Sequence, residues 1–182
     1  MNDARLQGWI VEVQDTSAQQ WLLRAVALAT SLGALAAVAA ETGRWWPFGL
    51  VVITVLSVSS AFRPDSYAAA LVIAIVAWHW LAVVDRVDTA WLPVTACMLF
   101  VYHSVIALTA TFPIGGVVPA QTLVVWLRRI ALVSGATVAM WGLVVVLDQR
   151  KTAGNGFLTA LALLVVAGGA VALRSHSLDE QR

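Results

Sequence analysis

The sequence has few charged residues and few of the residues that build metal sites. Only 12% of its 182 residues are charged, and 11 basic against 10 acidic side chains give a formal net charge of +1. The charges are spread over short turns and tails, so no basic patch is predicted to bind a nucleic acid backbone. One cysteine excludes an internal disulfide and a thiolate metal cluster within one chain.

Several signatures of enzymes are also missing. The chain contains no H-E-x-x-H, no G-x-S-x-G, no Walker A loop and no G-x-G-x-x-G motif. Asp85 and Asp88 flank Arg86 in a short polar turn, where a solvated cap is the simpler interpretation than a catalytic pair. We therefore expect no enzymatic activity, no cofactor and no metal site.

Long apolar runs dominate what is present. Hydrophobic residues make up 60% of the chain and the mean hydropathy is +0.84, which is typical of a protein that lies in lipid. A helix needs about 20 mostly apolar residues to cross a bilayer. The sequence therefore predicts one integral membrane domain over residues 1–182, an all-α polytopic bundle of about six transmembrane helices. The predicted spans are residues 18–40, 47–62, 67–84, 91–112, 130–147 and 157–173.

The two ends of the chain are more polar. In residues 1–16, four apolar side chains recur on one helical face, which predicts either a short helix on the membrane surface or a partly ordered tail. Residues 174–182 form a polar C-terminal tail. The four apolar residues are Leu6, Trp9, Ile10 and Val13.

The first span has a recognisable start. Ser17 followed by Gln20 matches a capping box. A secretory signal peptide is the competing interpretation, because Ala37-Val38-Ala39 resembles a cleavage site, but the polar leader is long for a signal peptide. We expect the span to be retained.

The apolar run that contains the fifth span is too long for one transmembrane helix, so the start of the span has to be placed within it. A helix from Pro119 to Leu147 would measure about 43 Å, which exceeds the hydrocarbon thickness. We therefore predict that Arg128-Arg129 divides it, with residues 119–129 at the interface and the span itself over residues 130–147.

Lysine and arginine counts indicate the orientation. With six spans and an inside N-terminus, seven basic residues lie inside and four outside, which favours cytoplasmic termini. The expected location is the plasma membrane. The apolar content, rich in alanine and valine, suits a bacterium with a GC-rich genome.

Small residues and hydroxyls indicate how the helices pack. Two predicted packing faces let another helix approach closely. In the second span, the Thr54 and Ser57 hydroxyls can bond back to the helix or across to a neighbour. The packing faces are Ala25, Ala29, Gly33 and Ala37 in the first span and Gly135, Ala139 and Gly142 in the fifth.

Residues 67–112 are predicted to form a transmembrane hairpin that organises the bundle, because they hold most of the polar groups within spans. His79 and Cys97 lie at similar depth, yet two ligands are fewer than a zinc or copper site needs. His79 and His103 differ in depth by roughly 10 Å, which argues against a haem held by both. His79 is more simply an interfacial residue among tryptophans.

The fourth span carries a polar wedge. Thr95, Tyr102, His103 and Thr109 project within one half of the helix circumference, so they should face protein or a water-filled cavity. The functional interpretation is a proton-relay or solute-contact site. The structural interpretation is an interhelical hydrogen bond from Tyr102 or His103.

Two functions remain open at this point. The first is a structural or accessory subunit of a larger membrane assembly, whose partners are the lipid bilayer and other membrane protein subunits or further copies of the chain. The alternative is a small-solute or proton-coupled transporter or channel with the polar wedge around His103 along the path. A membrane enzyme would need a cofactor or residues from a partner.

Overall fold

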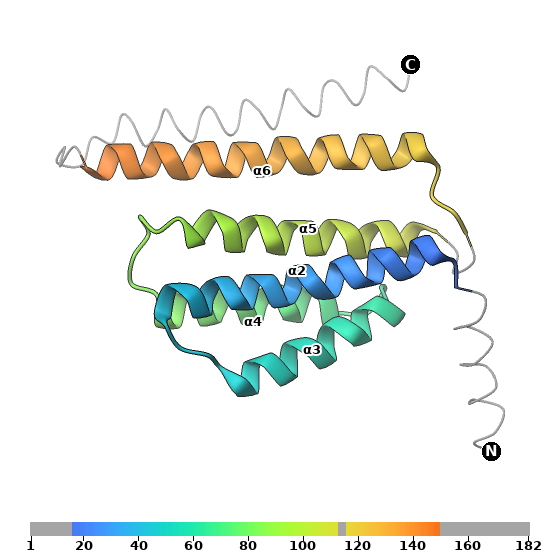
Figure 1. The fold of residues 1–182 in the computed structure, drawn as a ribbon, viewed down its shortest axis with the longest axis horizontal. Helices are drawn as coiled ribbons and strands as arrows, with labels where there is room; N and C mark the ends of the chain where they lie inside the picture. Colours follow the sequence, from blue (N-terminus) through green and yellow to red (C-terminus); the bar gives the residue numbers. More distant parts are fainter. Residues whose placement is uncertain (1–15, 113–115, 150–182) are drawn as a thin grey trace. The chain divides into compact units, whose positions relative to one another are not determined.

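The computed structural model describes residues 16–112 and 116–149, with side chains to residue 146. The described part of the chain is helical and contains no strand, which confirms the all-helical prediction. Figure 1 shows the helices in chain order. They are α2 (Ala18–Thr42), α3 (Pro47–Phe62), α4 (Ala68–Val83), α5 (Trp91–Thr111) and α6 (Ala120–Gln149).

The first four of these helices lie within two residues of the predicted spans. The predicted sixth span over residues 157–173 lies outside the described residues, as do the apolar face of the N-terminal segment and the polar tail over residues 174–182. Contacts group the chain into two units, Met1–Val144 and Val145–Arg182, and nearly all described residues belong to the first.

Not all helices have the length of a membrane span. In the described ranges, α2, α5 and α6 are long and apolar enough to cross a bilayer. By contrast, α3 and α4 have 16 residues each, about 24 Å at 1.5 Å per residue, which is shorter than a hydrocarbon core of about 30 Å. The chain is thus a helical protein compatible with a membrane, whereas six spans are not confirmed.

The boundary predicted for the fifth span is wrong. α6 is one continuous helix, Ala120–Gln149, rather than an interfacial segment over residues 119–129 followed by a helix over 130–147. Arginine is a good helix former and no proline lies within α6, so Arg128 and Arg129 do not interrupt it. Its 30 residues extend for about 45 Å, which a bilayer accommodates by helix tilt or by helix ends that reach the headgroups.

α2 begins and ends where its sequence dictates. Ser17 is the N-cap, and its Oγ accepts a hydrogen bond from the Gln20 backbone N–H at 3.3 Å, which confirms the predicted cap. At the other end, Gly43 adopts a left-handed conformation with φ 65°, which glycine reaches without a Cβ penalty.

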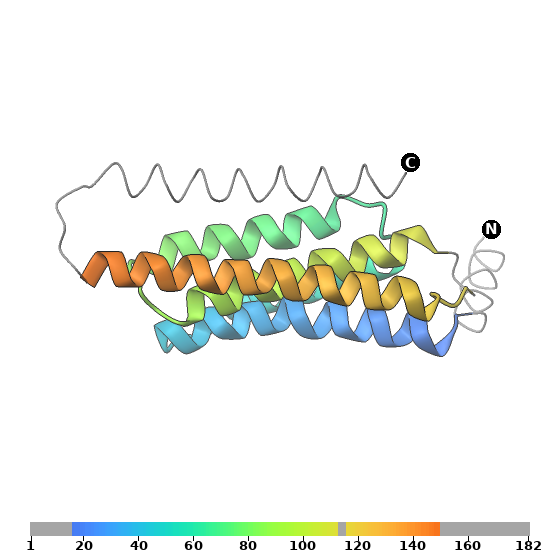
Figure 2. The ribbon, with the colours of Figure 1, turned by 90° about the horizontal axis from the view of Figure 1, so that it is seen from above.

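The bundle is organised around α2 rather than around the predicted hairpin. α2 packs most extensively against α5 and then against α3, whereas α4 and α5 touch each other only weakly. Figure 1 shows α2 running antiparallel to α5, and Figure 2 shows the same pair from above. The reason is that α2 presents small and branched side chains, so the backbones approach closely. Its fully buried residues include Ala27, Ser31, Ala34 and Val38.

The segment between α5 and α6 returns to the start of α2. Gln19 bonds Val118 in both directions: Val118 N–H donates to Gln19 Oε1 at 2.8 Å, and Gln19 Nε2 donates to the Val118 carbonyl at 3.4 Å. Ser17 Oγ donates to the Gly116 carbonyl at 3.3 Å. We call these three bonds the Gln19 clasp, because they tie the chain before α6 to the N-terminus of α2.

Candidate functional site

Four hydroxyl-bearing side chains lie in the centre of the bundle and are fully excluded from solvent. Ser31 of α2, Ser57 and Ser60 of α3 and Tyr102 of α5 each have 0% exposure. Burying a hydroxyl without a partner is costly, so these groups are expected to bond one another. We refer to these four residues as the hydroxyl network.

The geometry fixes the direction of each hydrogen bond in the network. Ser57 Oγ donates to Ser31 Oγ at 2.8 Å, and Ser31 Oγ donates to the Leu28 carbonyl at 2.9 Å. Ser60 Oγ donates its one proton to the Ser57 carbonyl at 2.9 Å. Tyr102 must therefore be the donor in its 2.8 Å contact with Ser60 Oγ.

Both branches of the network end on backbone carbonyls. A carbonyl accepts a hydrogen bond but has no proton to pass on. The arrangement therefore joins α2, α3 and α5 and satisfies every donor in it, without forming a continuous chain of exchangeable protons. It acts as interhelical hydrogen bonding of the kind that fixes packing in lipid.

The residues of the predicted polar wedge do not all face the same way in the structure. Thr95, Tyr102 and Thr109 are 4%, 0% and 7% exposed, while His103 is exposed on the outside of α5. The first three recur every seven residues and so share one face, whereas His103 lies about 100° further round the helix. Thr95 and Thr109 bond back to carbonyls of their own helix at 2.9 and 2.8 Å. Of the wedge, only Tyr102 bonds across to another described helix.

The two other candidate ligands lie in different surroundings. His79 stacks on the Trp46 ring with centroids 4.3 Å apart, while Cys97 Sγ lies 3.9 Å from the Ser134 carbonyl of α6. Among the described residues no group of three His, Cys, Asp or Glu side chains comes together to hold a metal ion.

One cavity, of about 620 Å³, lies at the end of the bundle where α2 ends and α3 begins. The stacked Trp46 and His79 rings line it, together with Glu41. A Cβ added to Gly49 would lie 1.9 Å from Trp46 Cε3, so the glycine is what allows the indole to lie against α3. Glu41 accepts a hydrogen bond from Thr89 Oγ1, which joins the end of α2 to the start of α5.

An exposed ion pair stands at this end of the molecule. Arg86 Nε and Nη2 donate to the two Asp88 carboxylate oxygens at 3.1 and 2.9 Å. The hydrogen bond from Arg86 lowers the pKa of Asp88, and the same bond raises the pKa of Arg86. With side chains 69% and 44% exposed, the pair contributes little to stability.

A second cavity, of about 520 Å³, lies at the opposite end, where α2 begins and α3 and α5 end. Arg24 is only 8% exposed there, and its guanidinium carbon lies 4.6 Å from the Phe62 ring centroid and 5.4 Å from that of Trp21. These distances are typical of cation–π contacts. The rest of the lining includes Gln20 and the loop after α3.

The predicted packing face of α2 turns only partly into the bundle. Ala25 and Ala29 are exposed, while Ala37 is 3% exposed. A Cβ added to Gly33 would lie 3.4 Å from Met98 Sδ of α5, which is ordinary contact. Sequence reasoning missed the neighbouring Ala27, Ser31 and Ala34, although their spacing is also that of small residues on one face.

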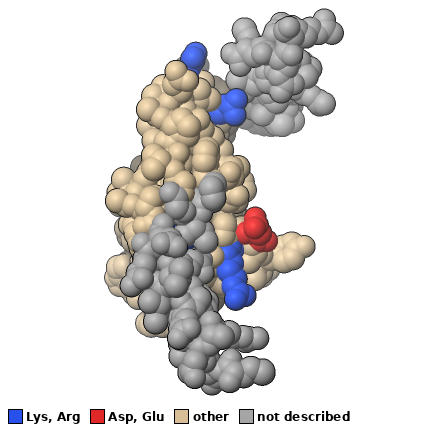
Figure 3. All heavy atoms as spheres, turned by 90° about the vertical axis from the view of Figure 1, so that its right-hand side faces the viewer, with Lys and Arg blue, Asp and Glu red and all other residues tan. Residues whose placement is uncertain are grey.

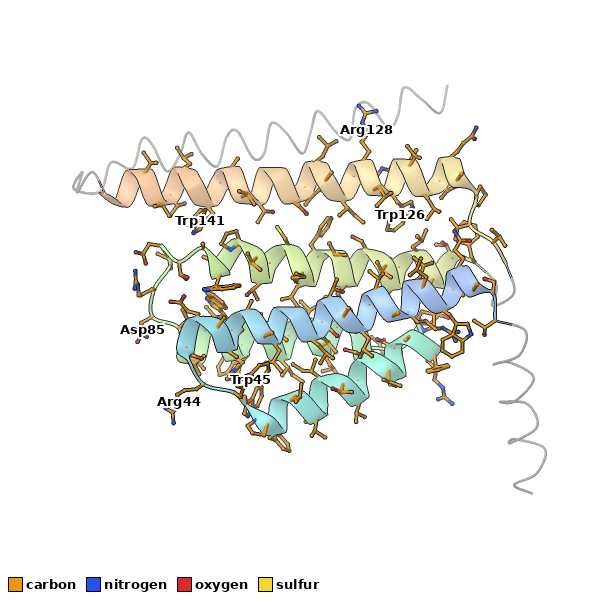
Figure 4. All side chains as sticks on the ribbon, viewed as in Figure 1. Arg44, Trp45, Asp85, Trp126, Arg128 and Trp141 are labelled. Atoms are coloured by element: carbon orange, nitrogen blue, oxygen red, sulfur yellow. The ribbon has the colours of Figure 1, made fainter. Side chains whose placement is uncertain are left out.

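The predicted face of α6 points away from the bundle. Ser134 and Trp141 contact α5 and the preceding loop through Cys97 and Val87. At about 100° per residue, Gly135, Ala139 and Gly142 lie on the other side of α6. Apart from its chain neighbours and the adjacent backbone of α6, no described atom lies within 4 Å of a Cβ added to either glycine. Figure 4 shows Trp126 and Trp141 pointing toward α5 and Arg128 pointing away.

The hydroxyl network was only partly predictable. The sequence left open whether the Thr54 and Ser57 hydroxyls bond back to their own helix or across to a neighbour: Thr54 bonds back to the Leu50 carbonyl, and Ser57 bonds across to Ser31. Ser31 and Ser60 were missed, because a serine in an apolar helix does not indicate which distant segment it will meet. The Gln19 clasp was missed for the same reason.

Comparison with known proteins adds no family or function. No protein-family model, no curated protein and no solved structure matches the chain. The class of protein is therefore defined by its helices alone: a helical chain with three helices of membrane-spanning length and composition in its described part.

Proposed function

We propose that the protein is a structural or accessory subunit of a larger membrane assembly, without catalytic activity of its own. The bundle of α2 to α5 is the scaffold, and α6 is the element that binds partner helices. We place it in the plasma membrane of a bacterium with both termini in the cytoplasm, on the basis of composition and arginine distribution.

The observation that carries this proposal is the uncovered surface of α6. The most apolar windows of α2 and α5 are each 44% buried, whereas that of α6 is 0% buried within the structure. In water such a helix would need covering. In a bilayer, lipid covers apolar side chains, and small residues mark where another helix packs.

The face of α6 that carries Gly135, Ala139 and Gly142 fits such a helix. These residues are spaced four and three apart, so they form one strip along the helix. Because they carry little or no side chain, a partner backbone can approach closely there, which favours van der Waals packing and Cα–H contacts. We propose that a helix of another subunit, or of a second copy, lies on this strip.

The transporter alternative has less support. It needs a polar path through the chain, but His103 is exposed on the outside of α5 and the hydroxyl network ends on carbonyls. In a transporter the replacement of His103 by alanine lowers or pH-shifts flux, whereas our proposal expects no effect.

The test is native mass spectrometry of the protein extracted from its own membranes, combined with photo-crosslinking from position 139. We expect a stoichiometric membrane partner, crosslinked at position 139. Ala139→Leu should reduce the recovered partner by about tenfold, because overpacking a tight helix contact costs about 1–3 kcal/mol.

Ala136→Leu is the matched control. It makes the same change on the same helix at an exposed position about 100° from Gly135 and about 120° from Gly142, and should leave the partner in place. Crosslinks only to lipid or to residues 150–182 of the same chain, with no partner in the spectrum, would overturn the proposal.

A further inference from the structure

The cavity at the start of α2 has a lining suited to an anion. Its walls come from Gln20 and Arg24 of α2, from residues 63–66 between α3 and α4, and from Thr109 of α5. Viewed from this end, the part of the surface formed by described residues is mostly uncharged, with a few basic and acidic side chains (Figure 3). The charge on this described surface is therefore carried by a few side chains.

Positive charge predominates among the described residues that line the cavity. These include two arginines, Arg24 and Arg63, and one acid, Asp65. Arg24 is 8% exposed and held by the rings of Phe62 and Trp21, so its position is fixed, whereas Arg63 is exposed at the mouth. A buried guanidinium attracts an anion more strongly than one in water, because the surrounding dielectric is lower.

Gln20 and Ser66 in the lining each carry a donor that has no hydrogen-bond partner among the described residues. Gln20 is 3% exposed, and its Nε2 atom is buried without an acceptor. Ser66 Oγ is likewise buried without a partner. The Ser66 hydroxyl does not cap α4, because that helix begins at Ala68 with Tyr67 as N-cap and no side-chain cap bond.

We propose that this cavity binds a phosphate group, and that this phosphate belongs to the headgroup of an anionic phospholipid. A phosphate offers several acceptor oxygens in a small volume, which matches an amide N–H, a hydroxyl and two guanidinium groups that line this cavity from α2 and from the loop of residues 63–66. Carboxylates offer fewer acceptors. This inference is independent of the proposed subunit role.

The position of the cavity favours a lipid as the source of the phosphate. Trp21, 41% exposed, lies beside it, and tryptophans gather at the membrane interface. The loop of residues 63–66 stands at the same end, where the apolar helices α3 and α4 meet. A headgroup phosphate lies at this depth, while the acyl chains extend along the apolar outside of the bundle.

The test uses the full-length protein in detergent, stripped of lipid and then given phosphatidylglycerol or phosphatidylcholine with the same acyl chains. Native mass spectrometry should show about tenfold tighter binding of phosphatidylglycerol. Arg63→Gln and Ser66→Ala should each weaken it by roughly tenfold, the loss typical of one hydrogen bond to a charged group. Both positions lie in a loop, so the helices are retained.

Arg44→Gln is the matched control, because Arg44 is an exposed arginine at the other end of the bundle. It should leave binding unchanged. A second arm adds inorganic phosphate to the stripped protein at constant ionic strength: a rise in melting temperature that Arg63→Gln removes would assign the site to a soluble phosphate compound. Equal binding of both lipids without an effect of phosphate, or equal losses in Arg44→Gln, would overturn the proposal.

Discussion

Tyr102 shows at the scale of one residue how polar groups are accommodated in an apolar bundle. Its ring fills space between helices with 0% exposure, and its hydroxyl donates to Ser60 of α3 at 2.8 Å. Interhelical hydrogen bonds of this kind contribute modestly, about 0.6 kcal/mol on average in a membrane protein, and more where a buried group would otherwise be unpaired. Tyr102 therefore specifies which face of α5 meets α3.

Replacing Tyr102 by phenylalanine keeps the ring and removes the hydroxyl. We expect the free energy of unfolding in detergent to fall by about 1 kcal/mol, since Ser60 loses one donor but keeps its bond to the Ser57 carbonyl. Tyr67→Phe is the control, because Tyr67 is 88% exposed and should change stability by less than about 0.5 kcal/mol. Equal effects at both positions would show that the buried hydroxyl contributes nothing specific.

Gly49 is required for a different reason, which is space. A Cβ at this position would meet the Trp46 ring at 1.9 Å, so Gly49→Ala must displace the indole from its stack on His79. We expect a loss of about 1–3 kcal/mol and faster modification of His79 by an imidazole-reactive reagent. Gly142→Ala, where no described atom beyond its chain neighbours and the adjacent backbone of α6 lies within 4 Å, should be neutral or slightly stabilising. Unchanged reactivity of His79 in Gly49→Ala would count against the stacked arrangement.

At the scale of elements, the contrast between α2 and α6 organises the molecule. α2 contacts α3, α4 and α5 through small residues, whereas α6 meets the described chain mainly through Cys97 and Val87. The covalent connection from α5 does not by itself fix the position of the first turn of α6. The Gln19 clasp supplies the connection, because it fixes the backbone before α6 against the start of α2.

Gln19→Ala tests the clasp. It removes both side-chain bonds to Val118, and we expect the Val118 amide to exchange roughly tenfold faster with deuterium while the amides within α2 and α5 keep their protection. Gln121→Ala is the control at an exposed glutamine, and should leave Val118 unaffected. Unchanged exchange in Gln19→Ala would mean that other contacts hold this segment.

At the scale of the whole molecule, the question is which helices cross the bilayer. α3 and α4 are shorter than the hydrocarbon core, but Arg44 before α3 and Arg63 after it are exposed at opposite ends of the bundle. A short helix can still span if the bilayer thins locally or flanking residues reach the headgroups. The antiparallel order of α2 to α5 then places the two arginines on opposite sides.

Cysteine labelling tests this topology directly. Cys97 is the single cysteine, so Cys97→Ala provides a background for Arg44→Cys and Arg63→Cys. In intact cells we expect a membrane-impermeant maleimide to label position 44 and not position 63, and inverted vesicles to give the reverse. Labelling of both positions from one side would show that α3 does not span.

The sequence by itself determined the helical class and the bounds of four helices to within two residues, because long apolar runs, a capping serine and turn residues act locally along the chain. It also determined that Ser57 has a hydroxyl available for a neighbour. Only the tertiary structure decided which partner that is, that α2 rather than residues 67–112 lies at the centre, and that His103 faces outward while Tyr102 faces inward. In a uniformly apolar helix the periodic contrast between buried and exposed sides is weak, so the inward face is set by how small residues and hydroxyls of distant segments fit together.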